Sequence, residues 1–162
     1  MALKILVTGG TFDKEYDEIT GSLYFKDTHM NEILDLGRSR VDVSIEKLML
    51  IDSLEMKKSH REFILKKCIE ADEGQIVITH GTDTMTKTAK VIAHKNLKKT
   101  IILTGAMIPY KFGSSDGLFN LGGAIAYAQS LKEGVYVAMN GQCFKWDKVE
   151  KNCKTGVFEK IK

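Results

Sequence analysis

The chain is poor in the residues that would mark a disulfide scaffold, a proline-rich linker or a membrane span. It has one proline, Pro109, and no run approaches the roughly 18 consecutive apolar residues that suggest a membrane-spanning helix. Its three cysteines are an odd number without a CxxC pair, which fits a reducing compartment better than a disulfide framework. No long apolar segment with a cleavage-like site opens the sequence, and we therefore expect a cytoplasmic protein.

Charge and histidine content narrow the kinds of ligand. The formal net charge is only +3, and the densest lysine pairs, Lys57-Lys58, Lys66-Lys67 and Lys98-Lys99, fall on predicted helix faces or turns. We interpret them as solvated surface, so neither nucleic acid nor a membrane is an expected partner. The histidines lack metal-ligand spacing with one another or with cysteine, so we expect no metal and assign them structural or surface roles. They are His29, His60, His80 and His94.

Apolar runs alternate with amphipathic stretches along the 162 residues. Strands are predicted over residues 3–7, 41–51, 75–79, 100–104 and 135–139. Helices are predicted over residues 29–36, from 59 to about 68, and over residues 84–94 and 117–131. Strands separated by helices in this way indicate an α/β fold, a doubly wound, mostly parallel sheet with helices on both faces. We expect a single domain over residues 1–162.

Local signals locate the helix ends and one long connection. Thr28 is the expected N-cap of the first helix and Gly37 its end. Ser59-His60-Arg61-Glu62 matches a capping box, which predicts the start of the second helix. The side chains expected to be buried by that second helix are Phe63, Ile64, the stem of Lys67 and Cys68. Residues 13–27 are too long for an ordinary connection; Ile19–Leu23 resembles a hairpin turn, and the stretch is a candidate lid.

Two predicted strands end in glycine turns that present threonine. These turns are Thr8-Gly9-Gly10-Thr11 and His80-Gly81-Thr82-Asp83-Thr84. A hydroxyl nucleophile needs close backbone approach to its target, and glycine permits it. Ligands of doubly wound sheets bind at the carboxyl ends of the strands, near the reversal of strand order. The turns expected at that edge hold Thr11, Ser53, Thr82, Asp83 and Gly105-Ala106-Met107.

A nucleotide-dependent enzyme is the alternative that the first glycine turn raises. GxGxxG is not completed, because Phe12-Asp13-Lys14-Glu15 follows and its acidic groups would repel phosphate. No tyrosine is followed four residues later by lysine, and no GxxxxGK[ST] motif occurs. We therefore expect no cofactor.

Taken together, the motifs resemble those of the bacterial-type L-asparaginase family. The resemblance runs from Ile5 to about Lys151. It is carried by Thr8-Gly9-Gly10-Thr11, Asp52-Ser53, residues 78–85, Gly105-Ala106-Met107 and residues 115–121. It implies a parallel α/β domain that hydrolyses the carboxamide of L-asparagine to aspartate and ammonia.

The resemblance also implies roles for single residues. Thr11 is implied to be the acylated nucleophile, and Thr82, Asp83 and Lys151 a second catalytic group. A tyrosine in the loop after the first turn partners Thr11 in the family. Both Tyr16 and Tyr24 are candidates, and Tyr24 is preferred for its distance along the chain.

Substrate contacts are implied in the same way. Ser53 is implied to hold the α-carboxylate and Asp83 to meet the α-ammonium, while the carbonyl of Ala106 receives the carboxamide nitrogen. Backbone amides of the glycine turns, with Gly10 among them, can face a developing oxyanion. The sequence departs from the family at Leu54, where many relatives have a polar side chain.

The resemblance covers only the first of the family's two domains. The family's smaller second domain, which carries an acidic residue and an asparagine to a neighbouring subunit's site, has no counterpart in these residues. We expect a short member that forms a homo-oligomer, a dimer or tetramer. Hydrolysis of glutamine or another small amide, and a catalytically weak amino-acid-binding domain, are the competing hypotheses.

Overall fold

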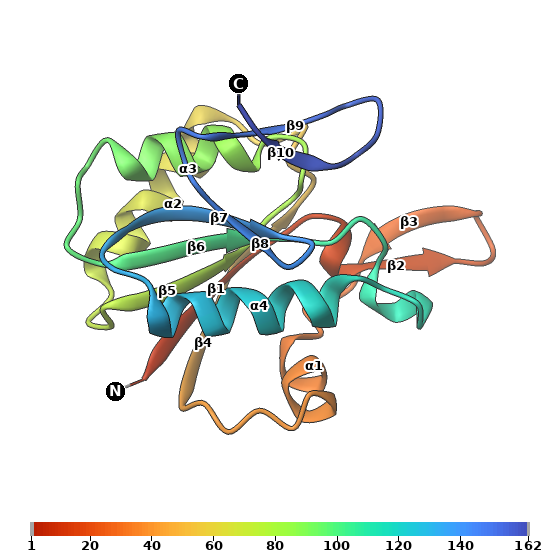
Figure 1. Ribbon diagram of the computed structural model, residues 1–162. Coiled ribbons are helices and arrows are strands. Elements are labelled where there is room, and N and C mark those ends of the chain that lie inside the picture. The colour runs from red at the N-terminus through yellow and green to blue at the C-terminus, as the bar shows by residue number, and fades with distance from the viewer. Residues whose placement is uncertain (1, 162) are drawn as a thin grey trace.

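The computed structural model describes residues 2–161 and has one six-stranded sheet with two small hairpins (Figure 1). The strands are β1 (Leu3–Gly9), β2 (Lys14–Asp17), β3 (Ser22–Phe25), β4 (Val43–Ile51), β5 (Gln75–Thr79), β6 (Thr100–Thr104), β7 (Gly134–Met139), β8 (Gln142–Lys145), β9 (Val149–Lys151) and β10 (Phe158–Lys160). The helices are α1 (Met30–Leu36), α2 (Lys58–Glu70), α3 (Met85–Ala93) and α4 (Gly117–Ser130), with short 3-10 turns η1 (Thr11–Asp13) and η2 (Tyr110–Phe112). Each of the five predicted strands and four predicted helices is present.

The strand order of the large sheet is β4-β1-β5-β6-β7-β8. All neighbours run parallel except β7 and β8, which are antiparallel. The predicted doubly wound, mostly parallel sheet is therefore confirmed. Among the five parallel strands, β4 lies on one side of β1, and β5, β6 and β7 follow on the other side. The strand order therefore reverses between β1 and β5, and in such sheets the reversal opens a crevice at the carboxyl ends of the strands.

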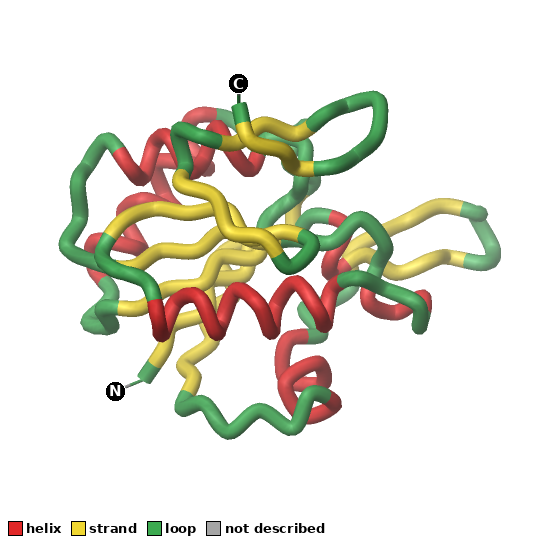
Figure 2. Tube along the Cα trace, viewed as in Figure 1, coloured by secondary structure: helices red, strands yellow, loops and turns green. Residues whose placement is uncertain are grey.

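Helices cover both faces of the sheet, as Figure 2 shows. On one face α2 and α3 pack against strand residues such as Ile78 and Leu103, with Ile64 and Ile92 fully buried. On the other face α1 and α4 bury Ile33 and the small side chains of α4 against the sheet. The central strands are buried on both sides, which explains why β5 and β6 are continuous apolar runs. Within residues 2–161 no helix is long and apolar enough to cross a membrane.

The second helix begins differently from the prediction. It starts at Lys58, and the N–H of Lys57 is accepted by His60 Nδ1 at 2.9 Å, so Ser59 does not cap it. Ile64 and Cys68 are buried as predicted, but Phe63 is 39% exposed. Lys99 is also not simply solvated, because its ammonium donates to the carbonyls of Cys68 and Ala71 at the end of α2. A lysine there satisfies carbonyls that the helix cannot.

The first helix is capped from a distant residue. Its N-cap is His29, one residue after the predicted Thr28, and Gly37 follows its last residue as predicted. Asp13 Oδ1 accepts the His29 N–H and the Thr28 hydroxyl, both at 3.0 Å. Asp13 therefore joins the two ends of the segment that residues 14–27 form.

That segment is a β-hairpin rather than an irregular loop. β2 and β3 pair antiparallel, from Lys14 opposite Phe25 to Asp17 opposite Ser22. The turn between them lies where it was predicted, but the two strands were not predicted. The hairpin projects from the edge at which the parallel strands end (Figure 1). Its position suits a covering element for that edge.

Residues beyond the fifth predicted strand make an unpredicted return. β8 turns back along the sheet, and β9 and β10 then pair, with Phe158 opposite Lys151. Val149 and Phe158 are buried in the same cluster as Met85 of α3, which fixes this hairpin above that helix. The return brings Lys151 to the carboxyl edge of the sheet.

Glycine allows the two turns at that edge to touch. Gly10 has φ +74°, and a Cβ on it would lie 2.4 Å from both Cα and N of Gly81. Gly81 itself meets Ser53, since a Cβ there would lie 2.6 Å from Ser53 Cβ. Side chains at either glycine would separate the ends of β1, β4 and β5.

Gly10→Ala should therefore destabilise the domain by more than about 2 kcal/mol, from positive φ and backbone overlap together. Gly122→Ala is the matched control, since a Cβ at this helical glycine would meet nothing within 4 Å. It should stabilise by about 0.5–1 kcal/mol. Urea unfolding of the two variants would contradict this account if they shifted the midpoint equally.

Candidate active site

Lys151, Thr82 and Asp83 form a hydrogen-bonded group. Lys151 Nζ donates to Thr82 Oγ1 at 2.8 Å and lies 2.7 Å from Asp83 Oδ1. Thr82 is buried, and the Lys151 side chain is only 12% exposed, whereas that of Asp83 is 44% exposed. The three residues lie close together as predicted, although Lys151 is 68 positions from Asp83 and 69 from Thr82 in the sequence. Within this group the Asp83 carboxylate is accessible to solvent, whereas the Thr82 hydroxyl belongs to a buried residue.

Thr11 lies on the neighbouring turn. It is partly buried and begins η1, directly after Gly10. Gly10 contacts Gly81, and Thr11 and Thr82 are the residues that directly follow these two glycines. The two threonines therefore begin from the same backbone contact. The fold thus brings the two predicted threonines to one edge of the sheet.

Ser53 is a buried residue that contacts the second turn at Gly81 and Thr84. It is 1% exposed, and its Oγ accepts the N–H of Thr84 at 3.2 Å. The Thr84 hydroxyl donates to the Ser53 carbonyl at 2.9 Å. Leu54 is 72% exposed, and its N–H is already bonded to Asp52 Oδ1 at 2.9 Å. The backbone amide of Leu54 therefore already has a partner within the protein.

The loop after β6 is held by two residues of the α4 start. Asp116 accepts the N–H groups of Met107 and Ile108 at 3.0 Å, and Asn120 Nδ2 donates to the Gly105 carbonyl at 2.9 Å. Ala106 lies within this loop and is buried. A Cβ at Gly105 would lie 2.4 Å from the His80 carbonyl and 3.3 Å from the Thr82 methyl, which places the loop beside the second turn.

Asp116 and Asn120 belong to a motif that the sequence singled out without giving it a role. Asn120 Oδ1 also accepts the N–H of Asn140, in the turn between β7 and β8. The side chain therefore ties two strand ends together. The sequence signal that could have predicted this role is the spacing of Asp116 and Asn120, two polar residues four positions apart at the start of a helix.

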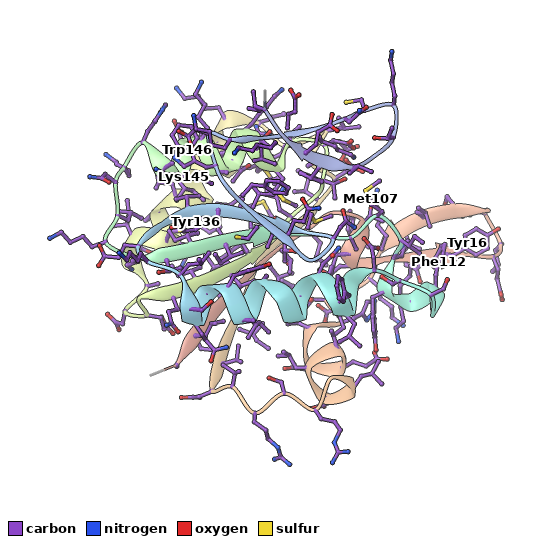
Figure 3. All side chains as sticks on the ribbon, viewed as in Figure 1. Tyr16, Met107, Phe112, Tyr136, Lys145 and Trp146 are labelled. Carbon is purple, nitrogen blue, oxygen red and sulfur yellow. The ribbon has the colours of Figure 1, made fainter. Side chains whose placement is uncertain are left out.

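The two candidate tyrosines lie on different strands of the hairpin. Tyr24 is in β3 opposite Glu15 and is 41% exposed. Tyr16 is in β2, 56% exposed, with its ring edge against Phe112 at 6.5 Å between centroids (Figure 3). Tyr16 thus packs the hairpin onto η2, which is a structural role.

The sequence reasoning missed two polar residues near the turns, one buried and one partly buried. Asp13 is fully buried two residues after Thr11, and burial raises its pKa, against the lowering effect of the bonds from His29 and Thr28. Arg61 of α2 donates to the hydroxyls of Thr84 and Thr88. In the sequence Arg61 is one of many surface-type cations on a helix, so nothing marked it.

His80 has a structural role, as expected of the histidines. Its Nδ1 contacts the Gly81 carbonyl and its Nε2 the Thr88 hydroxyl, both at 2.7 Å. Since a carbonyl only accepts, Nδ1 carries a proton; burial keeps the ring neutral at neutral pH, so Nε2 accepts from the Thr88 hydroxyl. Complete burial lowers the pKa of His80 from 6.5 to about 4.

Residues 2–161 contain no cluster of three or more histidine, cysteine or acidic side chains with the geometry to hold a metal ion. The residues of the candidate site instead offer the hydroxyls of Thr11, Ser53 and Thr82, the amine of Lys151, the carboxylate of Asp83 and backbone amides. Such a set can bind a zwitterion, polarise a carbonyl and transfer protons.

Fold and site together define a doubly wound α/β domain with a lysine–threonine–aspartate group at the strand-order reversal. Residues 2–159 match the family model described as Asparaginase, N-terminal. The chain belongs to the asparaginase family.

Curated relatives carry two kinds of name. One subunit of the glutamyl-tRNA(Gln) amidotransferase of Aeropyrum pernix is 31% identical over 147 residues, covering 85% of this chain and 34% of that protein. A probable periplasmic L-asparaginase of Haemophilus influenzae is 32% identical over 169 residues, covering 96% and 47%. The chain thus spans only a third to a half of the length of these relatives.

Solved structures give the same picture. The thermostable L-asparaginase of Thermococcus kodakarensis superposes with a TM-score of 0.88 at 30% identity, over 99% of this chain and 51% of that one. A probable cytoplasmic L-asparaginase of Campylobacter jejuni gives 0.77 at 31%, over 93% and 49%. The similarity covers the whole sheet and both sets of helices.

The neutral state of His80 predicts a stability loss in acid. Because the unfolded chain binds this proton near pH 6.5 and the folded chain only near 4, stability present at neutral pH is lost as the pH falls through that window. The contribution between pH 7.5 and 5 is about 2 kcal/mol. In urea unfolding, His80→Gln should be less stable at pH 7.5 but lose correspondingly less on acidification; equal losses in both proteins would refute the assignment.

Proposed function

We propose that the chain is an amidohydrolase that converts L-asparagine to L-aspartate and ammonia, with Thr11 as its nucleophile. The single observation that carries this proposal is the bonding of Lys151 to Thr82 and Asp83, on the turn that touches the Gly10 turn. Membership of the asparaginase family supports it. A protein that only bound amino acids would have no need of an amine held against a buried hydroxyl.

The chemistry proceeds in two balanced steps. Thr11 Oγ1 attacks the carboxamide carbon, its proton passes to the leaving nitrogen, and ammonia departs from an aspartyl ester of Thr11. Water then attacks the ester carbon, and its proton returns to Thr11 as aspartate leaves. Backbone amides of the glycine turns face the oxyanion in both steps, a contribution of about 3–4 kcal/mol per donor in other enzymes.

Lys151 supports these steps through Thr82. Its ammonium is held between a carboxylate and a hydroxyl, and its positive charge stabilises negative charge on the Thr82 oxygen. That oxygen can then orient a water molecule or accept a proton from it. Tyr24, carried on the hairpin, is the proposed partner of Thr11. A threonine hydroxyl needs such help because its own pKa leaves it almost wholly protonated at neutral pH.

Substrate recognition divides between two strand ends. Ser53 is proposed to donate to the α-carboxylate, and Asp83, whose carboxylate is partly exposed, to accept from the α-ammonium. The carbonyl of Ala106 is proposed to receive the carboxamide nitrogen, and the Gly10 amide to face its oxygen. Together these contacts would fix an asparagine between the turns of β1, β4, β5 and β6.

Glutamine is the competing substrate, favoured by the several relatives that are named as part of a glutamyl-tRNA(Gln) amidotransferase. Cytoplasmic location and assembly into homo-oligomers are further parts of the proposal. The first rests on the similarity to the C. jejuni protein, which is named as cytoplasmic, and the second on the resemblance to the family. Ammonia release from asparagine and glutamine, side by side, decides between the two amides.

Thr11→Ala should lower ammonia release from asparagine at least about 100-fold, because no hydroxyl remains to form the ester. The matched control is Thr20→Ala, an exposed threonine in the hairpin turn, which should retain the wild-type rate. A coupled ammonia assay from neutral to alkaline pH provides the measurement. If Thr11→Ala kept the full rate, another residue would be the nucleophile.

Lys151→Met should reduce kcat about 100-fold or more with little change in the melting temperature, since methionine keeps most of the buried stem and removes the amine. Lys148→Met removes an exposed lysine three residues earlier and should leave kcat unchanged. An unaltered kcat in Lys151→Met would remove the amine from the mechanism while leaving the family membership intact.

A further inference from the structure

Arg61 lies behind the candidate site rather than on the open surface of α2. Its guanidinium donates to Thr84 Oγ1 at 2.8 Å, to Thr88 Oγ1 at 3.1 Å and to the Met56 carbonyl at 2.9 Å. These three acceptors come from the loop after β4 and from the start and middle of α3. Arg61 thus joins the segments that follow two strands of the sheet.

One branch of this network ends at Ser53. The Thr84 hydroxyl accepts from Arg61, and its own proton goes to the Ser53 carbonyl at 2.9 Å. The Thr84 N–H meets Ser53 Oγ at 3.2 Å. Arg61 is therefore connected through one residue to the hydroxyl proposed to hold the substrate α-carboxylate.

The other branch ends at the turn of Thr82. The Thr88 hydroxyl accepts from Arg61 Nε and donates to neutral His80, whose Nδ1–H is bonded to the Gly81 carbonyl at 2.7 Å. Arg61 consequently holds two parts of the candidate site, the Ser53 loop and the turn that presents Thr82.

The charge of Arg61 has no counter-ion within residues 2–161. All three of its bonds go to neutral oxygens, and no carboxylate lies within 4.0 Å of it. Burial lowers the pKa of the guanidinium without discharging it, since Arg remains protonated at any physiological pH. A partly buried cation that lacks an anion favours the arrival of one nearby.

We propose that Arg61 is the specificity-determining positioning residue of this site. Its positive charge behind Ser53 favours substrates that carry an α-carboxylate, and its hydrogen bonds hold the Ser53 loop and the Thr82 turn in register. This inference rests on the proposed amidohydrolase function and adds to it a residue from the helix behind the site.

Substrates with and without the α-carboxylate provide the test. L-asparagine and 3-aminopropanamide differ only in that group, as do the products L-aspartate and 3-aminopropanoate. Arg61→Met should lower kcat/KM for asparagine about tenfold or more, mainly through KM, while the value for 3-aminopropanamide changes less than about threefold, because only the former loses a charge–charge attraction. Arg61→Lys keeps the charge and should retain most of the preference.

Inhibition constants give a second readout that does not need hydrolysis of a slow substrate. Arg61→Met should weaken inhibition by aspartate about tenfold and leave inhibition by 3-aminopropanoate nearly unchanged. Lys66→Met, an exposed lysine on the same helix, should alter neither ratio. Should Arg61→Met not fold, Arg61→Gln, which keeps donors without charge, takes its place beside Arg61→Lys.

Parallel loss toward both members of each pair would show that Arg61 only holds the fold together, and would overturn the inference. An active wild-type enzyme with an unchanged preference in Arg61→Met would do the same while leaving the proposed function standing. If wild-type protein releases ammonia from neither asparagine nor glutamine, the proposed function itself fails, and this inference falls with it.

Discussion

The contact between the backbones of Gly10 and Gly81 is the constraint on which the site depends. It brings the ends of β1 and β5 together where the strand order reverses, and a single added carbon atom at Gly10 would lie 2.4 Å from its neighbour. The two threonines that follow these glycines come from turns about 70 residues apart in sequence. Neither hydroxyl could share a substrate with the other if the strands separated there. The close approach of the two turns thus depends on a conformational property of glycine.

A second constraint comes from two hydrogen-bonded polar residues behind the candidate site, fully buried His80 and partly buried Arg61. His80 stays neutral because it is buried between a carbonyl and a hydroxyl, and Arg61 stays charged because guanidinium keeps its proton. The His80 ring and the hydroxyls of Thr84 and Thr88 are all hydrogen-bonded, which is the condition for a buried polar network to make a site rigid. The groups proposed to react could then meet a substrate without first having to become ordered.

The sequence predicted the sheet, its helices and the residues at its carboxyl edge, because apolar period and glycine turns are local signals. It did not predict the strands β2 and β3, whose exposed residues lack alternation, or β8 to β10, whose pairing is short and set by tertiary contacts. The start of α2 was wrong, since His60 rather than Ser59 supplies the cap. The predicted burial of Phe63 was wrong because its ring lies beside Lys67 at the surface. Arg61 and Asp13 were missed because their partners are distant in the chain.

Lys151 reaches the site on the penultimate strand, after the chain has folded back through β8. During synthesis the amine therefore leaves the ribosome long after both threonines and Ser53 have been made. A nascent chain that has assembled its five parallel strands still lacks the amine that bonds to Thr82 and Asp83. The order of residues along the polypeptide thereby delays completion of the candidate site until β9 has docked above α3.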